Sequence, residues 1–258
     1  MRTNTPPPTT CSTCRLRDIC MPVGLTSQQM AQIDHMVSTR VKVPRGQVLF
    51  HAGGRFKSLY AVRTGFFKTT MGTSDGREQV TGFYMSGELL GLDGIVQSQY
   101  TCNARALEDA DVCVLHMHEL NDLMPYVPPL QQHLQKIMSR EIVQEHDHMF
   151  LLGSQQAQAR VASFLRNLLH RLHQRGQAAD ELLLRMTREE MGSYLGLTIE
   201  TISRTLSKLA QSGVIAVNQR HVRILQPQVL HDLAEHTHIS GCTSPKTSAV
   251  NLHTDYVR

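Results

Sequence analysis

The sequence contains no run of about 18 consecutive apolar residues, the length that a membrane-spanning helix needs. Its first ten residues, MRTNTPPPTT, also lack the apolar segment of a secretory signal. These two absences predict a cytoplasmic protein that does not enter a membrane. Because the cytoplasm is reducing, the six cysteines are not expected to form a framework of disulfide bonds. Metal binding or redox chemistry then becomes the better explanation for cysteines that cluster.

Motifs typical of enzymes are absent as well. Ser154 and Ser193 lack the sequence context of a nucleophile elbow, and the glycines do not form a phosphate-binding loop. His146 and His148 are two positions apart on a predicted helix, so they would face different sides and could not share a metal ion. No enzymatic activity is therefore expected. A net charge of +4 permits nucleic-acid binding without requiring it.

The distribution of glycine, proline and short apolar runs predicts an α+β protein. Five β-favouring runs, QVLF, SLYAVR, FFKTTM, QVTGFYM and DVCVLHM, are separated by glycines and indicate an antiparallel β-roll or jelly roll. A long helix, from about Pro129 to Leu152, contains no internal glycine or proline. The predicted regions are a disordered start with a cysteine-containing arm (1–24), the β-roll (25–124), the long helix (125–153), a winged helix-turn-helix (154–239) and a loose tail (240–258).

The most specific segment is MTREEMGSYLGLTIETISRTLSKLAQSGVI, residues 186–215. Thr187 followed three residues later by Glu190 is a capping box that begins one helix, and Gly196 allows a sharp turn after it. Thr198 caps a second helix, in which Ile202, Leu206 and Leu209 have the spacing of a buried face. Two short helices joined by a tight glycine turn are typical of a helix-turn-helix, and VIAVNQRHVRIL after them predicts a hairpin wing.

The opposite face of the second helix carries the groups that read base edges in the major groove. Arg204 can donate two hydrogen bonds to guanine, Glu200 can accept one from cytosine, and Ser203 suits a base or a phosphate. Thr198 and Thr201 are also expected to contact double-stranded DNA. The residues expected to contact phosphates are Arg188, Lys208, Arg220 and Arg223. The alternative is a helical hairpin whose charged face is simply solvated.

Three cysteines lie close together in the N-terminal arm, as Cys11, Cys14 and Cys20. The arm is too polar to bury them as ordinary core residues, and Arg15 and Arg17 are expected to lower the pKa of the thiols. A fourth ligand would come from Cys102, Cys113 or Cys242. The spacing leaves zinc, an iron–sulfur cluster and unligated thiols open.

Taken together, these segments resemble the fumarate-and-nitrate-reduction (FNR) branch of the cAMP-receptor-protein superfamily, from about Cys11 to His236. The resemblance is carried by the cysteine arm, KSLYAVRTG (57–65), EQVTGFYMSGELLGLDGI (78–95), ALEDADVC (106–113) and LTIETISRTLSKLAQSG (197–213).

The resemblance implies a [4Fe-4S] cluster, degraded by oxygen, with Cys113 as the fourth ligand beside Cys11, Cys14 and Cys20. It leaves Cys102 as a small apolar residue in a strand, and Cys242 outside the site. It also implies that Glu200, Ser203 and Arg204 read a TTGAT-type palindrome as a homodimer, and that the loops of the β-roll contact RNA polymerase.

The long helix carries a heptad stripe, which predicts the dimer contact: Met138, Ile142, Glu145, Met149 and Leu152. Two Glu145 carboxylates facing each other would repel, so the cluster-free protein is expected to be monomeric and the loaded protein dimeric. The alternative is that Glu145 is an ordinary solvated residue.

Two related interpretations compete with an oxygen sensor. A cyclic-nucleotide-dependent regulator has an arginine after its Gly-Glu segment to pair with the phosphate. Here Gly87-Glu88 is present, but Tyr100-Thr101 stands where that arginine would fall, so no cyclic nucleotide is expected. A zinc-bound regulator without a sensing role would use the same four thiols.

Overall fold

The computed structural model describes residues 10–72, 76–154, 156–176 and 180–235. The predictions for residues 1–9 and for the tail from 240 onward, Cys242 included, lie outside these ranges. Among the helices of these ranges, none combines the length and apolar character needed to cross a membrane.

Two four-stranded antiparallel sheets form the N-terminal β-roll, as the sequence predicted. The first has the order β1-β8-β3-β6, with β1 at Arg40–Val43, β8 at Ala110–His116, β3 at Ser58–Thr64 and β6 at Leu89–Leu90. The second has the order β2-β7-β4-β5, with β2 at Val48–Phe50, β7 at Asn103–Ala106, β4 at Phe66–Gly72 and β5 at Glu78–Met85. Apolar side chains from both sheets, among them Val62, Phe67 and Val112, form one buried core.

The turn between β3 and β4 depends on a glycine. Gly65 has φ of +94°, and a Cβ atom at this position would lie 2.5 Å from the Cβ of Ala110. Both the backbone conformation and the close approach of β8 therefore exclude a side chain at this position.

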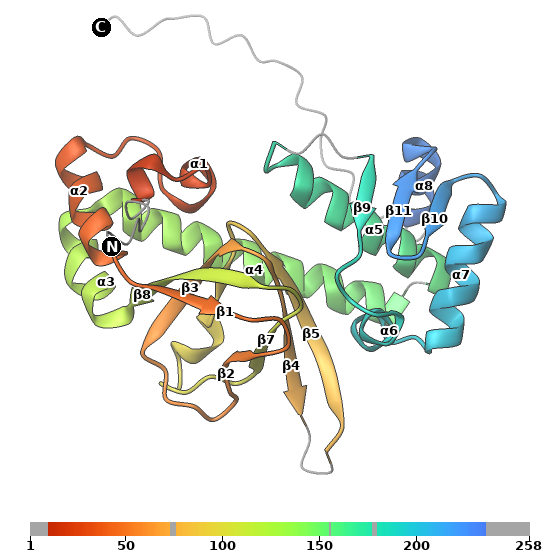
Figure 1. The fold of residues 1–258 in the computed structure, drawn as a ribbon, viewed down its shortest axis with the longest axis horizontal. Coiled ribbons are helices and arrows are strands. Elements are labelled where there is room, and N and C mark those ends of the chain that lie inside the picture. The colour runs from red at the N-terminus through yellow and green to blue at the C-terminus, as the bar shows by residue number, and fades with distance from the viewer. Residues whose placement is uncertain (1–9, 73–75, 155, 177–179, 236–258) are drawn as a thin grey trace, which may run out of the picture.

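The cysteine arm and the helices next to it cover one end of the β-roll (Figure 1). These elements are the 3-10 helix η1 (Cys11–Thr13), α1 (Arg17–Cys20), α2 (Ser27–Met36), α3 (Met117–Leu123) and η3 (Met124–Tyr126). A further 3-10 helix, η2, spans Leu92–Gly94. Thr26 begins α2 through a capping box with Gln29.

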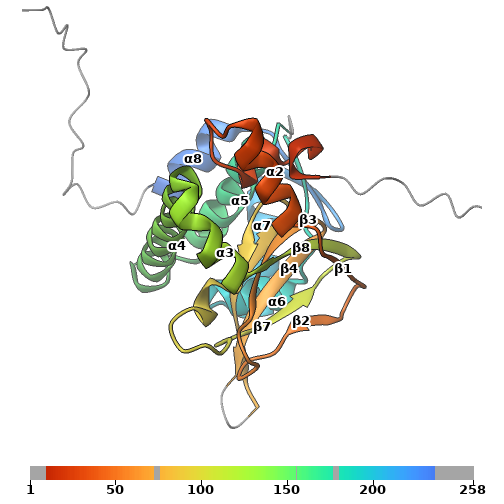
Figure 2. The ribbon, with the colours of Figure 1, turned by 90° about the vertical axis from the view of Figure 1, so that its left-hand side faces the viewer.

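The predicted long helix is α4, Pro128–Ser154, which runs from the arm toward the C-terminal elements (Figures 1 and 2). The C-terminal part consists of α5 (Ala157–His173), β9 (Glu181–Leu183), α6 (Arg188–Leu195), α7 (Ile199–Gln211), β10 (Ile215–Asn218), β11 (His221–Ile224) and α8 (Pro227–Glu235). The wing is a three-stranded sheet of order β10-β11-β9, one strand more than the predicted hairpin.

The β-roll and the C-terminal part share an apolar core. Phe66, Val80 and Phe83 of β4 and β5 belong to the same buried cluster as Leu165 of α5 and Met191 of α6. The outer face of this β-hairpin is thus the surface on which the helix-turn-helix packs, and the two parts are in direct contact.

Candidate DNA-binding and cysteine sites

Helix α7 has the architecture of a recognition helix. Thr198 caps it by accepting a hydrogen bond from the Thr201 backbone N–H (3.2 Å). Ile202, Leu206 and Leu209 are buried, as predicted from their spacing. On the other face, the side chains of the predicted base-reading and phosphate-contacting residues are exposed: Glu200, Ser203, Arg204 and Lys208.

The turn before α7 fixes the angle between the two helices. Gly196 has φ of +62°, and a Cβ atom at Gly192 would lie 2.5 Å from the carbonyl oxygen of Leu197. The Leu197 backbone N–H donates to the Gly192 carbonyl (2.9 Å), so α6 meets the turn closely. Two glycines therefore allow the tight approach on which a helix-turn-helix depends.

Hydrogen bonds at the start of α7 favour the ionised form of Glu200. Its own backbone N–H and the Thr198 hydroxyl lower the pKa of the Glu200 carboxyl, and the charge of Arg204 lowers it further. An ionised carboxylate is the form that accepts a hydrogen bond from the amino group of cytosine.

Arg188 differs from the exposed residues of α7. It is half-buried, and its guanidinium donates to the Gln219 carbonyl (3.3 Å) in the turn between β10 and β11. Burial also lowers the pKa of Arg188. In this structure the side chain joins α6 to the wing, and its contact with a phosphate stays a prediction.

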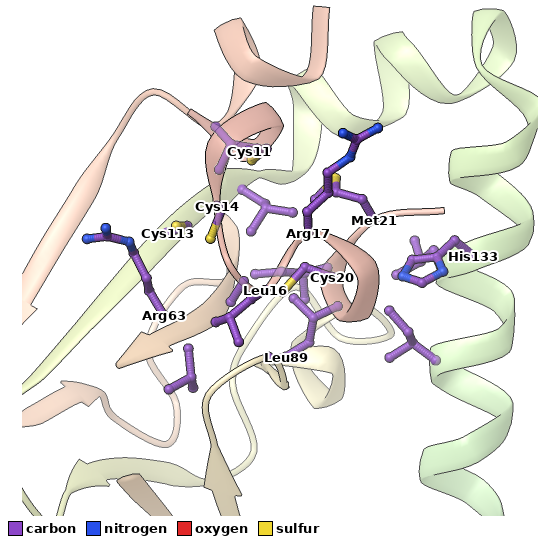
Figure 3. A pocket seen from close by; sticks show the side chains of 18 of the residues that line it. Cys11, Cys14, Leu16, Arg17, Cys20, Met21, Arg63, Leu89, Cys113 and His133 are labelled. Atoms are coloured by element: carbon purple, nitrogen blue, oxygen red, sulfur yellow. The ribbon is translucent and has the colours of Figure 1, made fainter. Parts of the chain in front are cut away.

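The structure brings four cysteines together. Cys11, Cys14, Cys20 and Cys113 line one largely apolar pocket between the arm, β8 and α4 (Figure 3). Cys113 lies at the centre of a sheet, where its strand is paired with Arg40 of β1 on one side and Ala61 of β3 on the other. A thiol on a rigid strand thus faces thiols on a short arm.

Cys102 lies elsewhere. It is buried in the core of the β-roll, and its sulfur is 3.6 Å from Asp93 Oδ2. The residue directly precedes β7, so its expected place within a strand is wrong by one position. Its burial agrees with the expected role as a small apolar residue.

Three of the four thiols in the pocket are held in their neutral form by burial. Burial raises the pKa of Cys11 and of Cys20 to about 12, and it also raises the pKa of Cys113. For Cys11 and Cys20, the expectation that Arg15 and Arg17 would lower the pKa is wrong, because burial and the neighbouring thiols dominate. The cations that oppose the shift are Arg40, Arg63 and Arg175. Metal binding here would therefore release protons.

The donor set fits a thiolate-ligated metal group. Four thiols in one apolar pocket suit zinc or an iron–sulfur cluster. Within the described residues, however, no group of three His, Cys, Asp or Glu residues is arranged to hold a single metal ion. A four-iron cluster binds each thiolate to a different iron, so its donors are spread more widely than those of one zinc ion.

A histidine that the sequence did not reveal borders the same pocket. His133 of α4 hydrogen-bonds the backbone of Cys20, while its Nε2 is buried and lacks a partner among the described residues. Burial lowers the pKa of His133. The end of the cysteine arm is thereby attached to the start of the long helix.

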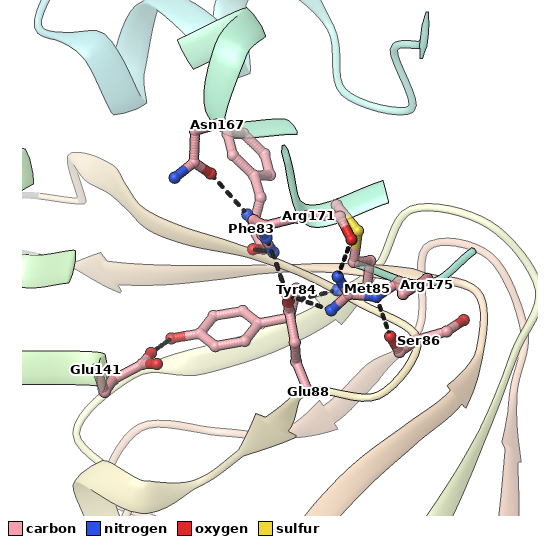
Figure 4. A network of polar contacts seen from close by, with 9 residues as sticks. All are labelled: Phe83, Tyr84, Met85, Ser86, Glu88, Glu141, Asn167, Arg171 and Arg175. Carbon is pink, nitrogen blue, oxygen red and sulfur yellow. Dashed lines mark hydrogen bonds and ion pairs between the residues drawn. The ribbon is translucent and has the colours of Figure 1, made fainter. Parts of the chain in front are cut away.

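An ion-pair network links the β-roll to α5 (Figure 4). Glu88 accepts hydrogen bonds from Arg171 Nε (2.9 Å), from Arg175 Nη2 (2.6 Å) and from the Met85 backbone N–H (2.9 Å). Arg171 also donates to the Phe83 carbonyl (2.6 Å). Glu88 therefore has its partners within the chain, although its Gly-Glu segment is the one that a nucleotide-binding relative would use.

Tyr100 fills part of the interior of the β-roll. Its ring stacks on Phe50 with centroids 4.0 Å apart, and its hydroxyl donates to the Ser58 carbonyl (2.8 Å). An aromatic residue bonded within the core stands at the place where a cyclic-nucleotide regulator would need a cation.

The predicted stripe on α4 is mostly on the surface. The exposed fractions are 39% for Met138, 56% for Ile142 and 61% for Met149, and Glu145 is exposed among them. Leu152 turns the other way, since its Cδ2 would be 3.3 Å from a Cβ atom at Gly196. Apolar side chains thus point into solvent along α4, and the last member of the stripe contacts the helix-turn-helix instead.

Comparison with known proteins agrees with both parts of the fold. Residues 40–125 match the cyclic nucleotide-binding domain, and residues 159–233 match the Crp-like helix-turn-helix domain. The structure of FixK2 from Bradyrhizobium japonicum superimposes with a TM-score of 0.70 at 30% sequence identity, over 76% of this chain and 96% of that one. A β-roll joined to a Crp-like helix-turn-helix defines a DNA-binding transcription regulator of the CRP/FNR class rather than an enzyme.

Two relatives narrow this class. The fumarate and nitrate reduction regulatory protein of Escherichia coli (strain K12) is 39% identical over 227 residues, 88% of this chain and 91% of that protein. The transcriptional regulatory protein btr of Bordetella pertussis is 41% identical over 215 residues, 83% of this chain and 89% of that protein. The chain belongs to the FNR family of the CRP/FNR superfamily, whose members bind DNA and form dimers.

Proposed function

We propose that this protein is a cytoplasmic, oxygen-responsive transcription regulator in which Cys11, Cys14, Cys20 and Cys113 hold a [4Fe-4S] cluster. The observation that carries the proposal is the convergence of these four thiols in one pocket, although Cys113 follows Cys20 by 93 residues. The family membership supports the DNA-binding half of the proposal independently.

The residues of this chain would hold the cluster in two ways. The arm supplies three thiolates within ten residues, and β8 supplies the fourth from a strand paired on both sides. Apolar side chains around the pocket, such as Leu59 and Leu115, exclude water from it. When bound, the cluster supplies the iron chemistry that oxygen attacks.

Dimerisation through α4 would then complete the DNA-binding unit. Two recognition helices must reach half-sites about one helical turn apart, which a monomer cannot do. We assign the apolar stripe of Met138, Ile142 and Met149 to this contact in the cluster-loaded protein, with residues 125–153 as the dimerisation segment. Glu200, Ser203 and Arg204 would read the TTGAT-type half-sites, and the β5 region, EQVTGFYMSG, would contact RNA polymerase.

The test is the metal and sulfide content of protein purified without oxygen, with its visible spectrum before and after exposure to air. We expect about four irons and four sulfides per chain, and a brown colour that fades in air. Cys113→Ser should abolish the absorption, whereas Cys102→Ser, a buried cysteine outside the pocket, should retain it. Zinc without sulfide would overturn the oxygen sensor and support a zinc-dependent regulator that uses the same thiols.

Cyclic nucleotides are not the proposed ligand, although residues 40–125 match the cyclic nucleotide-binding domain. Glu88 is bonded to two arginines, and Tyr100 occupies the core of the β-roll. Equilibrium binding of cAMP or cGMP to the purified protein should therefore be undetectable at millimolar concentration.

A further inference from the structure

The segment Gly87-Glu88 lies between the cysteine arm and the DNA-binding part and touches both. Gly87 faces α1, since a Cβ atom there would be 2.9 Å from Ile19 Cγ2. Gly87 and the following Leu89 also line the cysteine pocket. With φ of +90° and no space for a side chain, Gly87 lets the loop pack directly against α1.

The next residue connects this loop to the other part of the molecule. Glu88 forms ion pairs with Arg171 of α5 and with Arg175, just after the end of α5. Only 14% of the Arg171 side chain and 7% of the Arg175 side chain are exposed, so solvent screens these pairs little.

We propose that Glu88 is the positioning residue that couples the state of the cysteine arm to helix α5, and through α5 to the recognition helix. This inference rests on the proposed cluster function. The path is continuous: Ile19 in the arm, the loop at Gly87, the Glu88 carboxylate, and the two arginines of the DNA-binding part.

Two other ion pairs join the same two parts and provide matched controls. Lys68 of β4 pairs with Glu190 of α6 (2.7 Å), and Glu108 pairs with Arg185 beside the wing (3.0 Å). None of these four residues lines the cysteine pocket. They hold the parts together without touching the arm, so their loss should affect the loaded and the cluster-free protein equally.

The experiment measures the dissociation constant for a TTGAT-type palindrome with and without cluster. The quantity compared is the ratio of the cluster-free value to the cluster-loaded value. Glu88→Gln should lower this ratio about fivefold or more, the range of typical allosteric coupling. Glu88→Asp, which keeps the charge, should retain more of the ratio, and Glu108→Gln should leave it unchanged. A purely structural role for Glu88 would weaken both states together and would not move the ratio.

A second variant controls for loss of folding, because Glu88→Gln alone leaves two buried arginines without their carboxylate partner. Glu88→Gln combined with Arg175→Gln removes a cation together with the carboxylate and should lower the ratio as well. In the cluster-free protein, amide hydrogen exchange across residues 167–175 should accelerate in Glu88→Gln but not in Glu108→Gln.

The outcomes separate the two proposals. A wild-type protein that binds no cluster, or binds DNA equally with and without one, overturns the proposed function and this inference with it. A wild-type protein that responds to its cluster, beside Glu88 variants with the same ratio, overturns the inference alone.

Discussion

At the scale of single residues, the helix-turn-helix contains two kinds of cation. Arg204 and Lys208 extend from the exposed face of α7, where a groove of DNA can receive them. Arg188 is half-buried and bonded to the wing through Gln219. The sequence assigned Arg188 and Lys208 alike to phosphate contacts, because the difference between them depends on the turn between β10 and β11 lying beside α6.

Replacing the exposed arginine should reduce both affinity and specificity. Arg204→Ala removes two hydrogen bonds to a guanine and should weaken binding by about 1–3 kcal/mol while relaxing the preference at that base. Lys208→Ala, the control, should weaken binding to all sequences alike. It should also reduce the slope of the logarithm of the binding constant against the logarithm of the salt concentration by about 1. Titrations of the palindrome and of single-base variants at several salt concentrations distinguish the two. Unchanged base preference in Arg204→Ala would remove Arg204 from direct readout.

At the scale of elements, helix ends were easier to predict than short strands. Thr187 with Glu190 marks the start of α6, and Thr198 marks the start of α7. These caps were predictable because each is a hydrogen bond between residues that are close in the sequence. The runs that became β2, β3, β4, β5 and β8 were equally clear. The strands β1, β6 and β7 were not predicted, because each is defined by its pairing partner rather than by an apolar run of its own.

The capping box of α6 predicts a pH-dependent stability. Burial by itself would raise the pKa of the Glu190 carboxyl. The hydrogen bonds that it accepts from Lys68 Nζ (2.7 Å) and from the Thr187 backbone N–H (2.7 Å) outweigh burial and lower this pKa from 4.5. A lowered folded-state pKa contributes stability above the unfolded value, and this stability is lost as the pH falls through the folded value.

Glu190→Gln should therefore reduce the free energy of unfolding by about 1.5–3 kcal/mol at pH 7. The difference from wild type should shrink as the pH falls below about 4.5, as measured by urea unfolding at each pH. Glu189→Gln, which changes an exposed carboxylate in the same turn, is the control and should have a small effect. A difference independent of pH would show that the ionised carboxylate does not matter.

At the scale of the whole molecule, the cysteine site was predictable only in part. The spacing of Cys11, Cys14 and Cys20 indicates a local site, but Cys113 was chosen over two other cysteines only through resemblance to a family. The network of Glu88 with Arg171 joins residues 83 positions apart and follows no sequence pattern. Contacts of this kind arise from the packing of α5 on β5, which a single sequence does not specify.

The assembly state should depend on one carboxylate of α4. Glu145→Ala removes the charge from the exposed stripe of Ile142 and Met149, so the cluster-free variant should form dimers and bind the palindrome in air. Asp147→Ala, which removes another exposed carboxylate of the same helix, should leave the cluster-free protein monomeric, as we expect for wild type. Sedimentation equilibrium measures the outcome. A monomeric Glu145→Ala variant would mean that another force sets the assembly state.

Cys113 lies on a strand that is paired on both sides, so the β-roll must fold before the four-thiol site is complete. The arm emerges first during synthesis, but its fourth thiol joins it only after β1, β3 and β8 have paired across a long stretch of sequence. Such distant pairing is slow compared with the formation of local structure. A group held by all four thiols can therefore be inserted only into a β-roll that has already folded. Under the proposed function, the cluster-free protein is then a precursor during biogenesis as well as the form that remains after oxygen removes the cluster.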